Sequence, residues 1–408
     1  MNKRNLLTQL RGDRVDQAEF EQLIAGYFGH GSQLSNQEIA YGRAQGQHAL
    51  VLTYNQNGLL NKVSPGSDLA EDDLPNLQRK INDELLGSGP KKIRRRVLFT
   101  GLPTNGWFRY RDAFQIIPAP PEAPRPPQFI GKHPLLLEFS YPSSSSAIVS
   151  GQRQEKIGRE FELICSTLLS LRLTSTSGIT QWHWVLEMGG ADWTSSFRQG
   201  GYTWPGAVVE LDSFSAVESI PPMARCDPEE YYGRLGISPG QGLDVSSDIE
   251  VLLDRVSNLS RDHRDQFLRA SYWFQHAQEV FPLSRSAAFV ALVSAVEALM
   301  SELQGAGRCD ACGHSIGPGP TRRFADFVEM YLPRSRVPEP ERKRFYSLRS
   351  ALSHGGKLLR DDHMLWQFEP KRLGEQTDMR SMWRIVHLVL HNWLLDTKTN
   401  GTLTEPSC

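Results

Sequence analysis

The sequence predicts an α+β protein, in which a mixed α/β N-terminal region over residues 1–245 precedes an all-helical bundle over residues 246–400. Before residue 245 the apolar residues form short runs of strand length, separated by loops rich in Gly, Pro and Trp. From Asp248 onward they recur at three- and four-residue spacings, the pattern of amphipathic helices. With 408 residues, 39% of them hydrophobic, the chain can bury a substantial core without disulfide or metal support.

In the N-terminal region, an amphipathic helix is expected over residues 16–28 and a turn over residues 55–58. A second helix is expected over residues 155–172, where Ile157, Phe161 and Ile164 belong to one apolar stripe. A proline-rich connector near residues 118–127 cannot be helical. The fold of this region stays unassigned, and we expect it to sense or dock a partner. Strands are expected at residues 97–100, 107–109, 114–117, 135–139, 181–188 and 207–211.

The C-terminal bundle is expected to contain five helices, of which the second, over residues 284–303, has the clearest periodicity. Ser284 is its candidate N-cap, and Gly305 follows its end. Pro338 and Pro340 stand where a fourth helix would begin, because proline is tolerated in a first turn. The other helices are expected around Phe267–Val280 and residues 324–331 and 378–395, with a polar insert at 357–375 and a tail at 401–408.

Charge and cysteine content exclude several classes of protein. Lys and Arg number 45 against 46 Asp and Glu, which excludes a polybasic binder of the histone kind. Five scattered cysteines do not form a secreted disulfide framework. The N-terminus lacks the apolar stretch of a signal peptide, and no apolar run reaches the about 20 residues that span a bilayer. We therefore expect a cytoplasmic protein with no membrane partner.

The sharpest local feature joins Arg349 and His354 at the end of the fourth predicted helix, directly before two glycines. On an ideal helix the two side chains would lie about 140° apart, so only a chain that leaves the helix at His354 brings them together. An arginine fork suits phosphate, and histidine exchanges protons near neutral pH. The pair therefore suits phosphodiester cleavage. The alternative is structural: Arg349 pairs with a helix carboxylate and His354 satisfies the helix C-terminus.

The segment YSLRSALSHGG at residues 346–356 resembles the motif helix of HEPN domains, in particular the Apea-like group. The apolar helix that contains Glu297, and the CxxC loop and short helix after it, agree in order with that family. The resemblance covers about residues 248–395. It implies an all-α bundle, a homodimer through that bundle, and a metal-independent endoribonuclease that serves as an antiviral or toxin-like effector. Other members have lost activity and bind only RNA, nucleotide or a partner protein.

The resemblance makes Arg349 and His354 the catalytic pair and RNA the substrate. His354 would activate the 2′-OH or protonate the leaving oxygen, and Arg349 would stabilise the phosphorane. The products would be a 2′,3′-cyclic phosphate and a 5′-OH. Ser350 stands where many active members have Asn, Asp or His, and a hydroxyl supplies no charge. Ser350 and Ser353 are supporting candidates. An activating or inhibiting protein partner is also expected.

Three further groups have two open interpretations each. Glu297 either pairs with Arg349 or lies on the exposed edge of the bundle. The cations Arg342, Lys343 and Arg344 either guide RNA or form a solvated helix face. The basic run at residues 91–96 either contacts phosphates or is a solvated strand edge.

A zinc knuckle is the last candidate site. Cys309 and Cys312 have metal-ligand spacing, and His314 could be a third ligand. His387 and His391, four residues apart, could complete the set. The alternative is a knuckle without metal, since no second CxxC is present. A structural zinc is thus one expectation, while catalysis itself is expected to need no cofactor.

Overall fold

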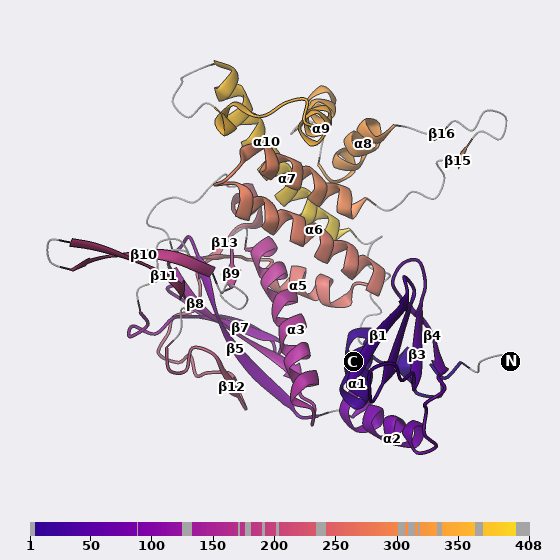
Figure 1. Cartoon of the computed structure of the whole chain (residues 1–408). Coiled ribbons are helices and arrows are strands. Elements are labelled where there is room, and N and C mark those ends of the chain that lie inside the picture. Colours follow the sequence, from indigo (N-terminus) through magenta and orange to yellow (C-terminus); the bar gives the residue numbers. More distant parts are fainter. Residues whose placement is uncertain are drawn as a thin grey trace, which may run out of the picture. The chain divides into compact units, whose positions relative to one another are not determined.

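The computed structural model of this chain (Figure 1) has α+β architecture, as the sequence predicts. Its contacts form two compact units, one of residues 1–94, 140–158 and 210–213, the other of residues 95–139, 159–209 and 214–408. The strands of residues 95–139 thus belong to the same unit as the helical bundle. The domain boundary near residue 245 stays a prediction. The structure describes residues 5–87, 89–124, 133–169, 172–175, 181–189, 192–200, 204–233, 242–300, 307–308, 315–316, 319–332, 337–363 and 370–396.

The first unit contains a four-stranded antiparallel sheet in the order β1-β2-β3-β4. Its apolar residues pack with those of the helices around a core that includes Phe20, Ile24, Leu52 and Ile81. The expected helix at 16–28 is confirmed. Asp16 caps it by accepting from the amides of Ala18 and Glu19. The elements are η1 (Gly12–Arg14), α1 (Gln17–Phe28), β1 (His30–Ser35), β2 (Glu38–Gly42), β3 (Leu50–Tyr54), β4 (Leu60–Pro65), α2 (Asp73–Lys80) and the π-helical turn η2 (Ile81–Leu86).

The sheet β1–β4 was not predicted, because β1 is mostly exposed and carries almost no apolar residues. The strands of this sheet pair through backbone hydrogen bonds, and β3 and β4 are joined by the tight turn at residues 55–58 that the sequence predicts. There the Asn55 side chain accepts from the amides of Asn57 and Leu59, and Gly58 adopts a φ of 75°.

A longer sheet has the strand order β12-β5-β8-β7-β6, with β9 paired to β5. The pair β7 and β8 is antiparallel and aligns Ile116 with Leu137. Phe161 of α3 packs against this sheet, at 5.0 Å from Phe114 and 6.1 Å from Phe139 between ring centroids. The strands are β5 (Lys91–Thr100), β6 (Phe108–Tyr110), β7 (Phe114–Pro118), β8 (His133–Pro142), β9 (Thr174–Ser175) and β12 (Val209–Leu211).

Helix α3 spans Ala147–Leu168, so it begins eight residues before the predicted start at residue 155. The early start includes Arg153, which donates to both carboxylate oxygens of Glu19 and to the carbonyl of Leu85 within the first unit. The remaining elements before residue 247 are the antiparallel pair β10 (Gln181–Gly189) and β11 (Asp192–Gly200), the helix α4 (Pro228–Gly233), and the parallel pair β13 (Arg225–Cys226) and β14 (Val245–Ser246). Of the proline-rich connector, residues 125–127 lie outside the described residues.

The helical bundle follows the predicted order. Ser260 and Ser284 each cap a helix by accepting from the amide three residues later. Pro338 and Pro340 stand at the start of the next-to-last long helix, as expected. The helices are α5 (Ile249–Asn258), α6 (Arg261–Val280), α7 (Arg285–Leu299), α8 (Pro320–Tyr331), α9 (Glu339–Ser353), η3 (Arg360–Asp362) and α10 (Pro370–Leu395), and a short pair β15 (Gly307–Arg308) and β16 (Ser315–Ile316) precedes α8.

Helix α7 is the centre of this bundle, because it packs against α6, α8, α9 and α10 (Figure 1). Its residues Phe289, Leu292, Val293 and Val296 are fully buried. The α7 helix ends at Leu299, before the predicted end at residue 303, and α10 begins at Pro370 rather than at residue 378. Within the part of the chain that the structure describes, no helix combines the length and the apolar character needed to span a bilayer.

Candidate functional site

The candidate site is built around Arg349, which lies on α9 and faces α7. Its Nη2 atom donates to Oε2 of Glu297 at 2.7 Å, and both side chains are 26% exposed. The Tyr346 hydroxyl donates to the other carboxylate oxygen at 3.0 Å. The ion pair that the sequence offered as one role of Glu297 is therefore present. A partly exposed pair of this kind fixes geometry more than it adds stability.

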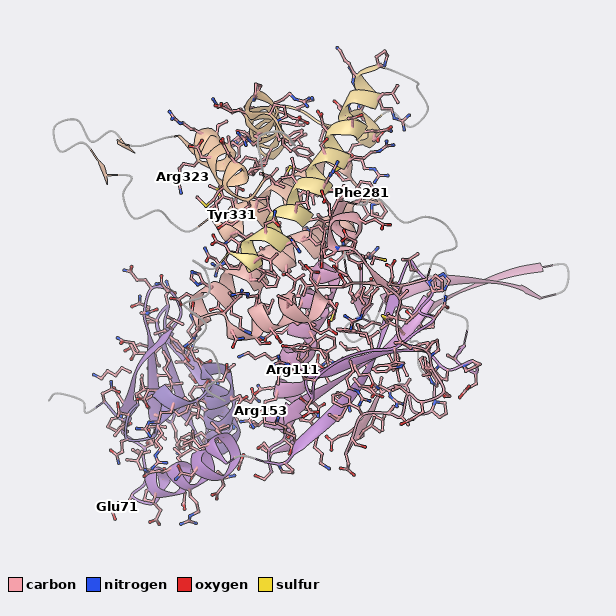
Figure 2. All side chains as sticks on the ribbon, turned by 180° about the vertical axis from the view of Figure 1, so that it is seen from behind. Glu71, Arg111, Arg153, Phe281, Arg323 and Tyr331 are labelled. Atoms are coloured by element: carbon pink, nitrogen blue, oxygen red, sulfur yellow. The ribbon has the colours of Figure 1, made fainter. Side chains whose placement is uncertain are left out.

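Tyr346 connects this ion pair to α8. Its ring lies 5.8 Å from the Arg349 guanidinium carbon and 5.3 Å from the Phe324 ring. Burial and the neighbouring Glu297 carboxylate raise the pKa of the Tyr346 hydroxyl above its usual value, so it stays protonated and donates. Arg323, whose charge acts on the same hydroxyl, lies on α8 (Figure 2).

Two guanidinium nitrogens at this site are buried without a hydrogen-bond acceptor among the described residues. They are the Nε atoms of Arg349 and Arg323. A buried donor that lacks an acceptor costs free energy. The Arg349 side chain is partly exposed, so an anionic oxygen can approach its guanidinium beside the Glu297 carboxylate.

His354 is the residue at which α9 ends. Its amide donates to the Ser350 carbonyl at 3.1 Å, and Gly355 then adopts a φ of 71°. The glycine thus takes the chain out of the helix at the predicted point. The imidazole is exposed and can meet a ligand from solvent. Ser353 is exposed as well, and Ser350 is half-buried.

The three cations before Arg349 have different environments, and the structure corrects the expectation for one of them. Arg342 is 0% exposed and pairs with Glu329 at 2.7 Å, so it cannot contact RNA in this fold. Lys343 is exposed and pairs with Glu339 one turn earlier on α9. Arg344 is exposed and forms a two-pronged pair with Asp378, both contacts 2.6 Å. A phosphate role for Lys343 and Arg344 stays a prediction.

Of the expected zinc ligands, the structure describes only His387 and His391. Cys309, Cys312 and His314 lie outside the described residues. His391 contacts Asp248 at 2.8 Å and Asn392 at 2.9 Å, whereas the His387 ring packs 4.7 Å from that of Phe274. Because the knuckle lies outside the described residues, the suggestion that these two histidines complete its metal site stays a prediction. Across the described ranges, no three His, Cys, Asp or Glu side chains are grouped to hold a metal ion.

The basic run at residues 91–96 forms the first part of β5, which is an interior strand of its sheet. Arg95 donates to the buried Glu138, and Arg96 is 5% exposed over the Phe139 ring. Lys92 pairs with Asp212. These contacts contradict the solvated edge for Arg95 and Arg96, because consecutive residues of an interior strand face opposite sides of the sheet and each of these side chains has a packed partner there. A phosphate role for the basic run stays a prediction.

Sequence reasoning did not weigh Tyr346 and Arg323 as members of the site. Tyr346 lies three residues before Arg349, one helical turn away, and that spacing was the available signal. Arg323 belongs to another helix, so no spacing relates it to Arg349.

Comparison with known proteins finds no matching family model, no matching curated protein and no matching solved structure. The chemistry of Arg349, His354, Glu297 and Tyr346 therefore has to be argued from their own geometry.

Proposed function

We propose that this chain is a metal-independent endoribonuclease of HEPN type. The observation that carries the proposal is the pair of Arg349 with the Glu297 carboxylate, which Tyr346 also holds, near the point where α9 ends in an exposed histidine. A fixed cation and a solvent-accessible imidazole are what cleavage of a phosphodiester by proton transfer requires.

Each side chain has a defined part in the proposed reaction. Guanidinium has five N–H donors, and Glu297 takes one of them through Nη2, which leaves others for a phosphate. Arg349 would stabilise the charge that develops on the phosphorane. His354 would take the proton of the ribose 2′-OH or give one to the 5′ oxygen, and the second histidine of a homodimer would take the other role. No metal takes part in these steps.

The biological role that we propose is an antiviral or toxin-like effector in the cytoplasm. The resemblance of the motif segment to Apea-like HEPN domains supports this role. In this proposal, residues 1–245 receive the trigger, and a protein partner activates or inhibits the ribonuclease.

A second candidate function is an inactive HEPN module that binds RNA, nucleotide or a partner protein. Two observations favour it. Ser350 supplies no charge beside Arg349, and the Glu297 carboxylate offsets the charge of the guanidinium. Such a module would bind RNA through Arg349 without cutting it.

The test compares three purified full-length proteins on total RNA in the presence of EDTA. They are the wild type, His354→Ala, and His363→Ala as a matched control, since His363 is a second exposed histidine in the same unit. We expect cleavage by the wild type and by His363→Ala, and a loss of at least about a hundredfold in His354→Ala. Expression of each in bacteria should slow growth in the same order.

Equal cleavage by the wild type and His354→Ala would contradict the proposed role of His354. If the wild type binds RNA without cutting it, and Arg349→Ala abolishes that binding, the inactive module is favoured instead. Arg384→Ala is the control for that arm, because Arg384 is an exposed arginine on α10.

A further inference from the structure

A separate cavity of about 270 Å³ lies in the helical bundle, and no residue that lines it belongs to the Arg349 site. It is bounded by the end of α6, the start of α7, η3 and the first half of α10. Phe281, at the end of α6, is labelled in Figure 2. The volume is just below the usual range for sites of drug-sized ligands, so a ligand of one or two rings would fit.

Two aromatic rings and two apolar side chains give the cavity its shape. Phe281 and Trp383 meet edge to face, with centroids 5.8 Å apart and ring planes at 84°. Leu359 and Met379 are 2% and 5% exposed and line the same space. A corner made by two perpendicular rings offers a planar ligand one face to stack on and one edge to contact.

The carboxylates that line the cavity already have cationic or amide partners. Asp361 accepts from Arg372 and from Gln376. Glu375 accepts from the amide of Arg360 at 2.7 Å and pairs with Lys357 at 3.3 Å. Neither Arg372 nor Lys357 lines the cavity, so the acidic charge is compensated from outside it.

Arg285 differs from these groups. Its Nη1 atom is buried and has no acceptor among the described residues, and its guanidinium carbon lies 3.3 Å from the centroid of the Phe281 ring. Burial lowers the pKa of this guanidinium although Asp361 and Asp362 act in the opposite direction. Asp362 does not accept from the Nη1 atom. Its two oxygens accept instead from the Ser284 hydroxyl and from the amides of Arg285 and Ser286. The exposed Arg380 lines the same cavity.

From this arrangement we infer that the cavity binds a small planar aromatic anion, whose ring packs against Trp383 and whose anionic group accepts from Arg285 and Arg380. A carboxylate or a phosphate would satisfy the buried Nη1 atom, and a guanidinium donor to an anion forms a strong, directional hydrogen bond. The ligand class has two sources, nucleotides and aryl carboxylates, and the inference goes beyond the proposed ribonuclease activity.

Isothermal titration of the full-length protein tests the inference with four compounds. Adenosine monophosphate represents nucleotides and indole-3-acetate represents aryl carboxylates, while adenosine and inorganic phosphate each lack one half of the ligand. We expect at least one aromatic anion to bind saturably, about tenfold or more tighter than adenosine or phosphate. Binding of only one of the two aromatic anions identifies the source.

The matched variants are Arg285→Gln, Arg380→Gln and Arg384→Gln. The first should weaken binding about tenfold or more, the second less, and the third should bind as the wild type does, since Arg384 does not line the cavity. Arg380 is exposed, so its variant tests the site even if Arg285→Gln does not fold. Binding of adenosine or phosphate as tight as that of the aromatic anions that bind, no saturation by either aromatic anion below about 10 mM, or unchanged binding in Arg380→Gln would overturn the inference.

Discussion

The side chain of Glu297 decides how Arg349 is presented. It is the only acidic residue of α7, and both its oxygens are engaged, one by Arg349 and one by Tyr346. An apolar helix with a single carboxylate raised this possibility in the sequence, but only the crossing of α7 and α9 pairs the two residues. The ion pair is partly exposed, so its role is orientation rather than stability.

Glu297→Gln removes the charge and keeps the size of this side chain. We expect RNA cleavage to fall by about tenfold to a hundredfold, because a misdirected guanidinium costs transition-state contacts. The thermal midpoint should change little, since exposed pairs contribute about 1 kcal/mol or less. Glu339→Gln is the control, as it removes the exposed partner of Lys343. Full activity in Glu297→Gln would show that the ion pair has no part in catalysis.

His387 gives the bundle a dependence on pH. Burial lowers the pKa of this imidazole to about 4, and its Nε2 atom has no partner among the described residues, although part of the residue reaches solvent. The unfolded chain, with an ordinary histidine pKa near 6.5, binds the proton more readily. The stability from a neutral His387 is therefore fully present above about pH 6.5 and is lost as the pH falls toward 4.

Urea denaturation at pH 7.5 and pH 4.5 measures this loss. For the wild type we expect a contribution on the order of 3 kcal/mol from His387, since each tenfold change in proton affinity is about 1.4 kcal/mol. His387→Leu should lose most of that pH dependence, whereas His363→Ala, at an exposed position, should retain it. An identical pH dependence in His387→Leu and wild type would contradict the assignment.

At the scale of the element, the end of α9 determines where His354 points. Gly355 has a φ of 71°, a conformation that L side chains rarely adopt, and no atom lies within 4 Å of the position of an added Cβ. Glycine is therefore required at position 355 by the left-handed backbone conformation and not by steric contacts. The sequence could predict this helix end, since a glycine pair after a periodic segment is a stop signal.

Gly355→Ala and Gly356→Ala form a matched pair at this helix end. Gly356 has no positive φ, and an added Cβ would meet only the Ala351 carbonyl at an ordinary 3.6 Å. We expect Gly355→Ala to destabilise the protein by about 1 kcal/mol and to lower RNA cleavage, because His354 would be displaced. Gly356→Ala should be close to neutral in both measurements. The same effect from both substitutions would show that the left-handed turn is not what positions His354.

Across the whole molecule, the sequence predicts elements best where capping and periodicity agree. Ser284 and the prolines at 338 and 340 mark helix starts that the structure confirms. Starts without such signals were predicted late, as for α3 and α10. The sheet β1–β4 was missed, and its first strand carries little apolar pattern. Local sequence determines the helix starts that carry a capping residue or a proline. Tertiary contacts, such as that of Arg153 with Glu19, determine the starts that carry no such signal.

The candidate site divides in the same way. Arg349, His354 and Gly355 are close in sequence, so their spacing already indicated a functional segment. Arg342 was misjudged because burial depends on which face of α9 meets α8, where it pairs with Glu329. Arg323 and the cavity beside Arg285 depend on contacts between separate helices, and no linear spacing reports those.

The chemistry of the cut ends distinguishes the proposed cleavage by Arg349 and His354 from other nuclease reactions. A short RNA and its counterpart with a single 2′-deoxy substitution at the cleavage site would be incubated with wild type and His354→Ala in EDTA, and the products analysed by mass spectrometry. We expect a 2′,3′-cyclic phosphate and a 5′-OH from the RNA with wild type only, and no cut at the substituted position. Ends with a 5′-phosphate, or cleavage that does not need the 2′-OH, would contradict the proposed cleavage.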